Sequence, residues 1–398
     1  MSGPGTPAIT TPDRRGSGAF KWDLAADSEI PMWVADMDFS VAPEIVTALQ
    51  DRLQHPVFGY TGVPDSYREA VAQWELKRNG WEIDLGTMVV VPSVMPALAV
   101  AVEAMTEPGD RIATFSPVYY PFFETIEAQG RVVERIPLAG ADQYHFDLAA
   151  VEHVLPRVKL LLLCSPHNPG GRVWHRDELT ALRDRAETAG VPVVSDEIHS
   201  DLVFPGETFV PWLSTGGATE RDMALIAPSK TFNIPGLPTA TAVVPHSSWR
   251  HQYKAALNAH MLRLPNLLAI TAAEAAYRHG GAWLDQVRST IFEHYQLVRS
   301  TLAEEPGVMV HRMEGTFIAW IDLRERWSTL PPREGSRSER FGAFARTHGV
   351  WLSDGRHFGP EGEGCMRMNV ATSRATLEEG LRRFRGALKA FDIEETTG

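Results

Sequence analysis

The sequence has little of what marks several large classes of protein. Its 398 residues include only two cysteines, Cys164 and Cys365, which cannot form a disulfide framework and fit a reducing, cytoplasmic location. Strongly apolar runs such as LLLLC at 160–164 are too short to span a bilayer. The first twenty residues lack the apolar core of a signal peptide and predict a flexible arm. We therefore expect a protein without membrane spans.

Basic residues are also fewer than acidic ones. The chain has 38 Lys and Arg against 50 Asp and Glu, and its formal net charge is −12 at pH 7. Such a surplus of negative charge opposes binding to a phosphate backbone, so we expect no nucleic-acid partner. With 44% hydrophobic and 22% charged residues, the composition is that of a globular protein. At this length we expect more than one domain.

Short apolar runs alternate with helical patterns over the first 245 residues. This alternation is typical of a mostly parallel sheet with helices on both faces. A helical pattern then extends from about 266 to 303, interrupted at Gly280 and Gly281, and a smaller alternating unit follows. Seven runs predict strands, at 88–91, 112–115, 132–136, 159–163, 192–195, 223–227 and 240–244.

These patterns predict a three-layer α/β fold in two domains. We expect residues 46–280 to form a large domain around the seven-stranded sheet, and residues 281–398 to form a smaller C-terminal α/β domain. Residues 1–45 would be an arm that contributes part of the small domain.

Lys230 is the one charged residue in the apolar stretch 223–244. A buried ammonium costs several kcal/mol unless its pKa shifts or it forms a covalent bond, and buried lysines tend to be reactive. Residues that could bind a ligand, through side chains or through backbone N–H groups, also follow four other predicted strands. They are Val94 and Met95 at a helix start, the tyrosines Tyr119 and Tyr120, Asn168 in SPHNPGG, and Asp196 in DEIHSDL.

Each of these features is ordinary when it occurs alone. A carboxylate often caps a helix, an Asn-Pro pair often makes a turn, and paired tyrosines often fill a core. Ligands of open α/β sheets, however, bind beyond the carboxyl ends of the strands, where all of these features fall together. Pyridoxal phosphate needs this combination: a helix start for its phosphate, an aromatic face and an amide for its ring, a carboxylate for its nitrogen and a lysine for its aldehyde. The sequence therefore predicts a pyridoxal phosphate site.

Six ordered stretches carry a closer resemblance. From about residue 20 to 390 the chain resembles the fold-type I pyridoxal phosphate enzymes of the class I/II aminotransferase superfamily, and within them the cystathionine β-lyase and PatB-type C–S lyase branch. The stretches are PMWVADMDF at 31–39, FGYTGVPDSYREAVAQW at 58–74, SPHNPGGRVW at 165–174, SDEIHSDL at 195–202, SKTFNIPGL at 229–237 and GRHFGPEGEGCMRMNVA at 355–371.

The resemblance implies roles for the matching residues. Lys230 would bind the cofactor covalently and move the substrate α-proton, Asp196 would pair with the ring nitrogen, and Tyr119 would stack on the ring. Arg367 would bind the α-carboxylate of an amino-acid substrate. The resemblance further implies a homodimer with shared active sites and no metal ion. A substrate channel would be bordered by Asp36 and Tyr60. The remaining cofactor contacts would come from Asn168, His199, Val94, Met95, Ser229 and, across the dimer, Tyr60.

Two departures from the family pattern bear on the reaction. Ser93 stands where this branch usually has a glycine, at the turn expected to hold the phosphate. The stretch GLPTATA at 236–242 lacks the arginine with which many aminotransferases of this fold bind phosphate, and this favours a lyase.

The favoured activity is cleavage of an S-substituted L-cysteine such as cystathionine to a thiol, pyruvate and ammonia. An aminotransferase stays open as the alternative, as does a relative that acts on a larger cysteine S-conjugate, including one with a decarboxylating outcome. Members of this fold also serve as regulators, either fused to a DNA-binding domain or by contacting a transcription factor. We expect no such fusion, because the residues before the first matching stretch are too few for a helix-turn-helix, while a contact with a transcription factor stays open.

Overall fold

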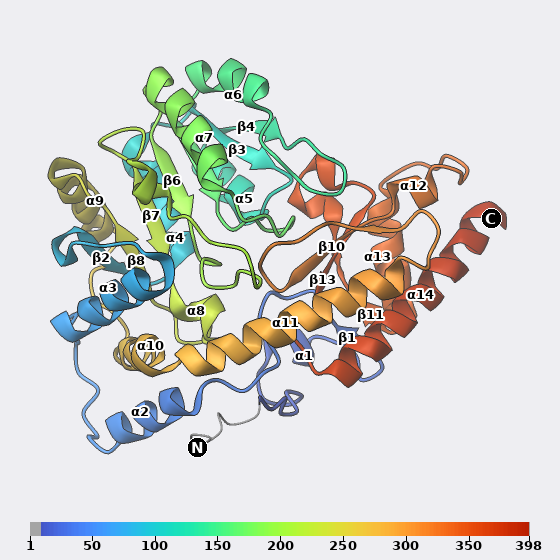
Figure 1. The fold of residues 1–398 in the computed structure, drawn as a ribbon, viewed down its shortest axis with the longest axis horizontal. Coiled ribbons are helices and arrows are strands. Elements are labelled where there is room, and N and C mark those ends of the chain that lie inside the picture. Colours follow the sequence, from blue (N-terminus) through green and yellow to red (C-terminus); the bar gives the residue numbers. More distant parts are fainter. Residues whose placement is uncertain (1–8, 398) are drawn as a thin grey trace.

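The computed structural model describes residues 9–397. All seven predicted strands form, each within one or two residues of its predicted ends, and together they make one sheet (Figure 1). Their bounds are β2 Met88–Val91, β3 Arg111–Ser116, β4 Val132–Pro137, β5 Leu160–Cys164, β6 Val193–Asp196, β7 Met223–Ile226 and β8 Ala240–Val243.

The sheet is mostly parallel, as predicted. Its strand order is β2-β8-β7-β6-β5-β3-β4, and only β8 pairs antiparallel with both of its neighbours. Helices cover both faces, which makes the expected three-layer α/β arrangement. These helices include α4 Val94–Met105, α5 Pro121–Ala128, α6 Leu148–Val154, α7 Arg176–Ala189 and α9 Ser247–Ala259.

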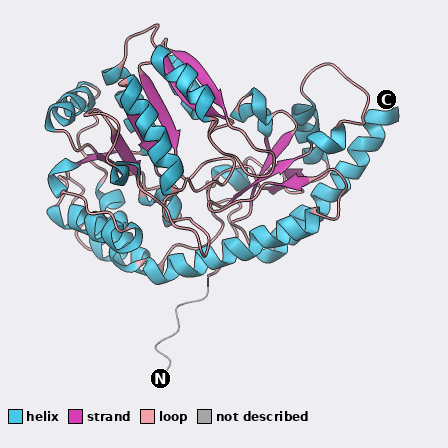
Figure 2. Ribbon diagram, turned by 45° about the horizontal axis from the view of Figure 1, so that its top comes forward, coloured by secondary structure: helices cyan, strands magenta, loops and turns pink. Residues whose placement is uncertain are grey.

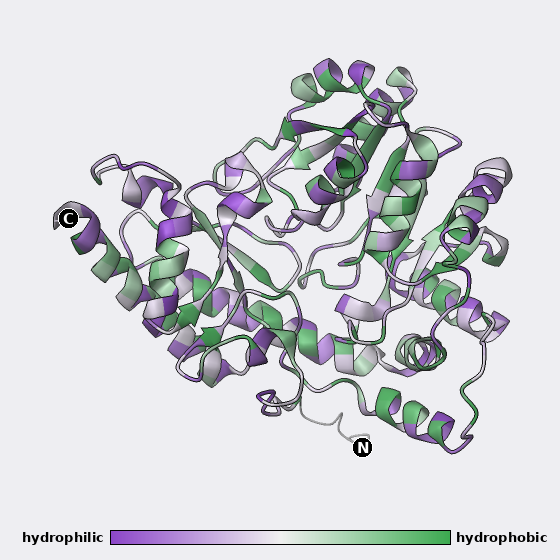
Figure 3. Ribbon diagram, turned by 180° about the vertical axis from the view of Figure 1, so that it is seen from behind, coloured by the Kyte–Doolittle hydropathy of each residue, from purple (hydrophilic) through white to green (hydrophobic). Residues whose placement is uncertain are grey.

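The continuous apolar runs of the central strands follow from burial on both faces. In β5, Leu160 and Leu162 pack in one core cluster with residues of α4, α5 and α9, whereas Leu161 and Leu163 pack in another with residues of α6 and α7. Because successive side chains point to opposite faces, a strand covered on both sides must be apolar at every position. The hydrophobic colouring of these strands and the mixed colouring of the helices show this difference (Figure 3).

A second, smaller sheet forms in the C-terminal part of the chain. Its antiparallel order is β12-β13-β10-β9, with bounds β9 Met309–Val310, β10 Ile318–Asp322, β12 Ser353–Asp354 and β13 Cys365–Asn369. Three helices accompany it: α12 Arg324–Trp327, α13 Arg337–Thr347 and α14 Arg374–Thr397. The N-terminal strand β1 Ile30–Pro31 pairs in parallel with β11 Val350–Trp351, which connects the arm to this part of the chain. The domain limits at residues 45 and 280 stay predictions.

The predicted long helical segment forms two helices, α10 Leu267–His279 and α11 Gly281–Leu302, with the break at Gly280. A side chain at Gly280 would come within 2.6 Å of the Phe232 ring, so this position needs a glycine. From the break, α11 extends beneath the main sheet to the second sheet, where it packs on α14 (Figures 1 and 2). Two further helices, α2 Pro43–Leu53 and α3 Asp65–Asn79, pack against α10 below the main sheet (Figure 1).

The N-terminal stretch differs from the flexible arm that the sequence predicts. The first eight residues of that prediction lie outside the described residues. From there on, Arg14 makes ion pairs with Asp36 and Asp38, and Arg15 donates hydrogen bonds to the carbonyls of Ala25 and Glu29. The expectation of a free arm is therefore wrong for this stretch, because two arginines bind it to the chain that follows. Across residues 9–397, no helix combines the length and the apolar character that crossing a membrane requires.

Candidate active site

Three strands of the main sheet end side by side at one edge, and the predicted site residues follow them. Cys164, at the end of β5, lies in register with Asp196, at the end of β6. Beyond β5 comes Asn168, and beyond β7 comes Lys230 in the short helix α8 Pro228–Thr231. Parallel strands thus deliver the amide, the carboxylate and the amine to the same place.

A cavity of about 220 Å³ lies at this edge. With the exception of Tyr60, every residue predicted for the cofactor site lines it: Lys230, Asp196, Tyr119, Asn168, His199, Val94, Met95 and Ser229. The other lining residues are Ala35, Ser93, Cys164, Ile198, Pro235, Pro238 and Thr239. The structure therefore brings the predicted residues together, while the role of each stays a prediction.

Lys230 faces this cavity and is half-buried. Its Nζ donates a hydrogen bond to the carbonyl of Ala35 at 2.5 Å. Burial lowers the pKa of Lys230 to about 8; Asp36 and Asp196 oppose this shift, and Arg367 adds to it. A lysine with this pKa has a substantial fraction of neutral amine near pH 8, as a nucleophile or a base requires.

Asp196 is a buried carboxylate without a salt-bridge partner among the described residues. Its side chain is 3% exposed and accepts a hydrogen bond from the backbone N–H of Ile198 at 3.1 Å. Burial raises the pKa of Asp196 to about 7, although Ile198 and Lys230 both oppose this shift. A cation placed in the cavity against this carboxylate would favour its ionised form.

The first turn of α4 closes another side of the cavity and can hold an anion. Val94 and Met95 begin this twelve-residue helix, and free N–H groups at a helix start attract negative charge. Ser93, which precedes them, has φ −168° and ψ 172°, an extended conformation that any residue adopts. The serine in place of the family's glycine therefore introduces no backbone strain. Ser229 and Thr239 add hydroxyl groups to the same cavity.

Two buried ring side chains complete the cavity. Burial, assisted by the charges of Lys230 and Arg367, lowers the pKa of His199 to about 3, so its imidazole is neutral. Its Nδ1 is buried and has no hydrogen-bond partner within residues 9–397. Burial, assisted by Tyr120, raises the pKa of Tyr119 to about 12, so its hydroxyl stays protonated.

Arg367 reaches the site from β13 of the smaller sheet. Its guanidinium donates hydrogen bonds to Asn168 Oδ1 at 3.1 Å, to the carbonyl of Trp33 at 2.8 Å and to Ser353 Oγ at 3.3 Å. It also lies 4.6 Å from the centroid of the Phe358 ring. Burial lowers the pKa of Arg367 to about 10, which leaves it charged at neutral pH.

A wider cleft of about 990 Å³ adjoins the cavity. Ala35, Tyr119 and Lys230 line both spaces, and Arg367 lines the cleft. Aromatic side chains supply much of its wall, namely Phe20, Trp33, Tyr120, Phe123 and Trp351. A small molecule bound by Arg367 would therefore lie between Lys230 and an aromatic vestibule.

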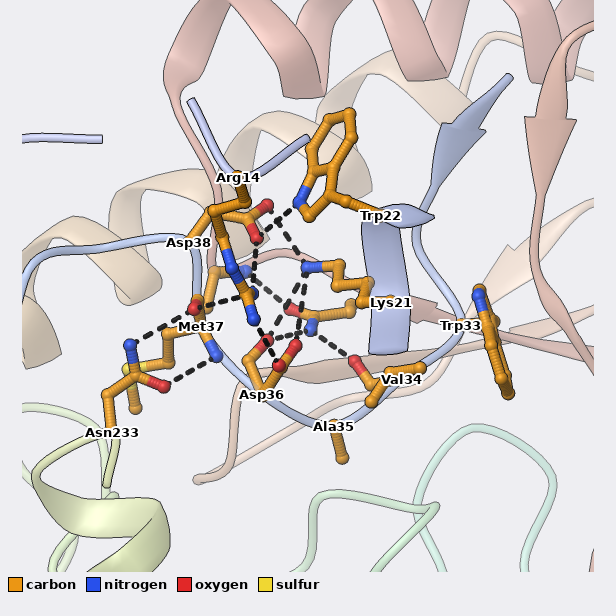
Figure 4. A network of polar contacts seen from close by, with 12 residues as sticks. Arg14, Lys21, Trp22, Trp33, Val34, Ala35, Asp36, Met37, Asp38 and Asn233 are labelled. Atoms are coloured by element: carbon orange, nitrogen blue, oxygen red, sulfur yellow. Dashed lines mark hydrogen bonds and ion pairs between the residues drawn. The ribbon is translucent and has the colours of Figure 1, made fainter. Parts of the chain in front are cut away.

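Two predicted site residues lie elsewhere. Asp36 borders neither space; its carboxylate forms an ion pair with Arg14 and lies 3.9 Å from Lys21, while the neighbouring Ala35 lines the cleft (Figure 4). Tyr60 is 98% exposed, in a surface groove with Phe58 and Leu264.

Sequence reasoning missed the backbone carbonyls of the segment 33–38. Ala35 O accepts from Lys230 and Trp33 O accepts from Arg367, but a carbonyl leaves no signal in residue type. It also missed Arg14 and Lys21, which bind the carboxylates of this segment. The signal available was the pair of acidic residues in PMWVADMDF, since two acids in a buried segment require cations.

Known proteins resemble this chain along nearly its whole length. The chain is 38% identical to cystathionine beta-lyase PatB of Bacillus subtilis (strain 168) over 94% of this chain and 98% of that protein. It is 35% identical to protein MalY of Escherichia coli (strain K12) over 95% of this chain and 97% of that protein. Cystalysin from Treponema denticola, solved with pyridoxal 5'-phosphate, superposes with a TM-score of 0.90 at 31% identity and covers 96% of this chain and 98% of its own.

A family model described as "Aminotransferase class I and II" matches residues 30–384. This match spans both sheets and includes Lys230, Asp196 and Arg367. The predicted fold-type I resemblance and the C–S lyase branch are thereby confirmed. The chain belongs to the aminotransferase class I and II family.

Proposed function

We propose that this chain is a pyridoxal phosphate-dependent C–S β-lyase. Its reaction would convert an S-substituted L-cysteine, such as cystathionine, and water into a thiol, pyruvate and ammonia. The observation that carries this proposal is the convergence of Lys230, Asp196 and Arg367 on one continuous space at the edge of the main sheet. The 38% identity to a cystathionine beta-lyase over nearly the whole chain supports the same activity.

The residues of the cavity fit pyridoxal phosphate in their chemistry. Asp196, buried without a salt-bridge partner among the described residues, suits a protonated pyridine nitrogen, and the start of α4 suits the phosphate. Asn168 suits a ring substituent, and so does His199 Nδ1, which lacks a hydrogen-bond partner in the described part of the chain. When bound, the cofactor supplies an electron-withdrawing ring that stabilises negative charge at the substrate Cα.

The residues around the substrate would act in a fixed order. Arg367 binds the α-carboxylate and orients the Cα–H bond towards Lys230. The amine of Lys230 removes the α-proton, and its pKa of about 8 places it near neutrality, where a base works best. The Cβ–S bond then breaks, and the thiolate leaves towards the wide cleft and is released as a thiol. Water hydrolyses the remaining fragment to pyruvate and ammonia.

The size of the cleft favours one variant of this activity. A space of about 990 Å³ with an aromatic wall accommodates an S-substituent larger than that of cystathionine. A bulkier cysteine S-conjugate is therefore the second candidate substrate.

We also propose a homodimer in which Tyr60 completes the partner's site. Tyr60 is 98% exposed, and the apolar side chains of Val57, Phe58, Met261 and Leu264 are exposed as well. An apolar patch of this kind is typical of an interface. The unpaired Cys164 and Cys365 support a cytoplasmic location.

Product analysis tests the proposed activity. Incubation with cystathionine and no added 2-oxo acid should give thiol, pyruvate and ammonia in equal amounts, and Lys230→Ala should abolish all three. A requirement for a 2-oxo acid would instead assign an aminotransferase. Carbon dioxide in place of pyruvate would assign a decarboxylating reaction.

A further inference from the structure

One short segment of the arm contacts both groups to which the proposed function gives the central roles. The carbonyl of Ala35 accepts from Lys230 Nζ at 2.5 Å, and the carbonyl of Trp33 accepts from Arg367 at 2.8 Å. The position of the segment 33–38 therefore affects the amine that moves the proton and the guanidinium that binds the carboxylate.

A buried ion network holds the other side of this segment (Figure 4). Arg14 pairs with Asp36 at 2.7 Å and with Asp38 at 2.9 Å, and Lys21 pairs with Asp38 at 3.0 Å. Lys21 is 1% exposed and Asp38 is 4% exposed. The indole N–H of Trp22 adds a hydrogen bond to Asp38 at 2.8 Å. Two cations and two carboxylates are thus balanced in a site where an unpaired charge would be costly.

Two amide side chains bind the segment to the elements that carry Lys230 and Arg367. Asn233, three residues after Lys230, accepts from the N–H of Met37 at 3.0 Å and donates to the carbonyls of Met37 and Phe39. Asn369, two residues after Arg367 in β13, donates to the carbonyls of Val34 and Asp36, each at 2.6 Å. A shift of the segment 33–38 would therefore move the neighbours of both the Lys230 amine and the Arg367 guanidinium.

The network also acts on Lys230 through its charges, in addition to the contact through the carbonyl of Ala35. Asp36 and Asp196 favour the protonated lysine, while Arg367 and the burial of the amine disfavour it. His199, the remaining titratable side chain influenced by Lys230, is neutral. Removing Lys21 would leave its two carboxylates with one cation, so the potential at Lys230 would become more negative. Removing the charge of Asp36 would have the opposite effect.

We propose that Arg14, Lys21 and Asp36 are positioning residues for the reaction: their buried ion network fixes the carbonyls of Ala35 and Trp33 against Lys230 and Arg367. This inference rests on the proposed roles of Lys230 and Arg367. The network would thereby make catalysis depend on the arm, although none of its charged side chains lines the cavity or the cleft.

Three single variants test the proposal in the holoenzyme: Lys21→Met, Arg14→Gln and Asp36→Asn. The first readout is a pH titration of the visible absorbance of pyridoxal phosphate bound to Lys230. We expect Lys21→Met and Arg14→Gln to raise the midpoint of this titration, and Asp36→Asn to lower it, by about 0.5 unit or more. The second readout is steady-state kinetics, in which we expect kcat to fall about tenfold and KM for the substrate to rise, because both Lys230 and Arg367 lose a fixed neighbour.

A double variant and a matched control separate positioning from general destabilisation. Lys21→Met combined with Asp38→Asn removes one charge of each sign and should return the titration midpoint towards the wild-type value. Arg385→Gln breaks an ion pair with the buried Glu305, between α14 and the end of α11, and should lower thermal stability without changing the midpoint or the kinetics.

The proposal is wrong if the network variants lose thermal stability as Arg385→Gln does but keep the wild-type midpoint and kinetics. If Lys21→Met does not fold, Arg14→Gln tests the proposal in its place. The Arg14 side chain is 22% exposed and therefore tolerates replacement better. An assay of the wild-type protein distinguishes failure of this proposal from failure of the proposed function. If the wild type releases thiol without a 2-oxo acid, the proposed lyase activity stands, whatever the variants show.

Discussion

Replacement of Arg367 by lysine tests how the substrate is held. Among the described residues, three of the five guanidinium donors have partners, in Asn168, Trp33 and Ser353. Two donors are left, one on Nε and one on Nη1, and these charged donors can bind an α-carboxylate. A lysine keeps the charge but presents its donors from a single nitrogen, in a different geometry.

The expected loss follows from the hydrogen bond that the lysine cannot make. A hydrogen bond to a charged group contributes about 1.5–3 kcal/mol, so kcat/KM should fall by about 10-fold to 150-fold. Arg367→Ala should lose more, and it should lower kcat as well as raise KM, since the carboxylate contact also orients the Cα–H bond. The assay is the initial rate of thiol release over a range of substrate concentrations.

Arg356→Lys is the matched control for this measurement. Arg356 lines the same cleft, but its side chain is 59% exposed and its ion pair with Glu363 spans 3.7 Å. We expect a change of about twofold or less, because an exposed pair contributes little. A kcat/KM for Arg367→Lys within twofold of the wild type would refute the proposed carboxylate contact.

Three further outcomes follow from the structure. Asp196→Ala should weaken pyridoxal phosphate binding and slow exchange of the substrate α-proton with solvent, measured by NMR in deuterium oxide; an unchanged exchange rate would remove Asp196 from its role. Two inactive variants, Tyr60→Phe and Lys230→Ala, should regain partial activity when unfolded and refolded together, whereas a fully active monomer in sedimentation would exclude a shared site. Burial lowers the pKa of His311 to about 4, so the folded state excludes a proton that the unfolded state binds below about pH 6.5, and stability is lost as pH falls through this range. His311→Leu should therefore reduce the loss of unfolding free energy between pH 7 and pH 5 by about 2 kcal/mol, measured by urea denaturation; an equal loss in both proteins would contradict this.

Much of the fold could be predicted because its signals are local. The central strands are apolar at every position since both of their faces are buried, and this pattern is visible in LLLLC without any other part of the chain. The break between α10 and α11 was likewise marked by Gly280. Lys230 was found because it is the one charge in an apolar stretch, and Asp196 because it ends such a stretch.

The rest depends on contacts between residues distant in sequence. Arg14 and Lys21 meet Asp36 and Asp38 only after the arm folds back, and their spacing follows no periodic pattern. The carbonyl of Ala35 reaches Lys230 across 195 residues. The extended φ of Ser93, which makes a serine as suitable as a glycine there, is also a property of the folded backbone.

The number of thiols released per subunit without any 2-oxo acid tests the central claim most directly. A lyase returns its cofactor to the starting state in each cycle, whereas an aminotransferase stops after one turnover until an acceptor restores it. With an S-substituted L-cysteine in excess, we expect many thiols per subunit, a matching amount of pyruvate, and no effect of added 2-oxo acid. Consumption of one substrate molecule per subunit, with turnover restored by a 2-oxo acid, would contradict the account.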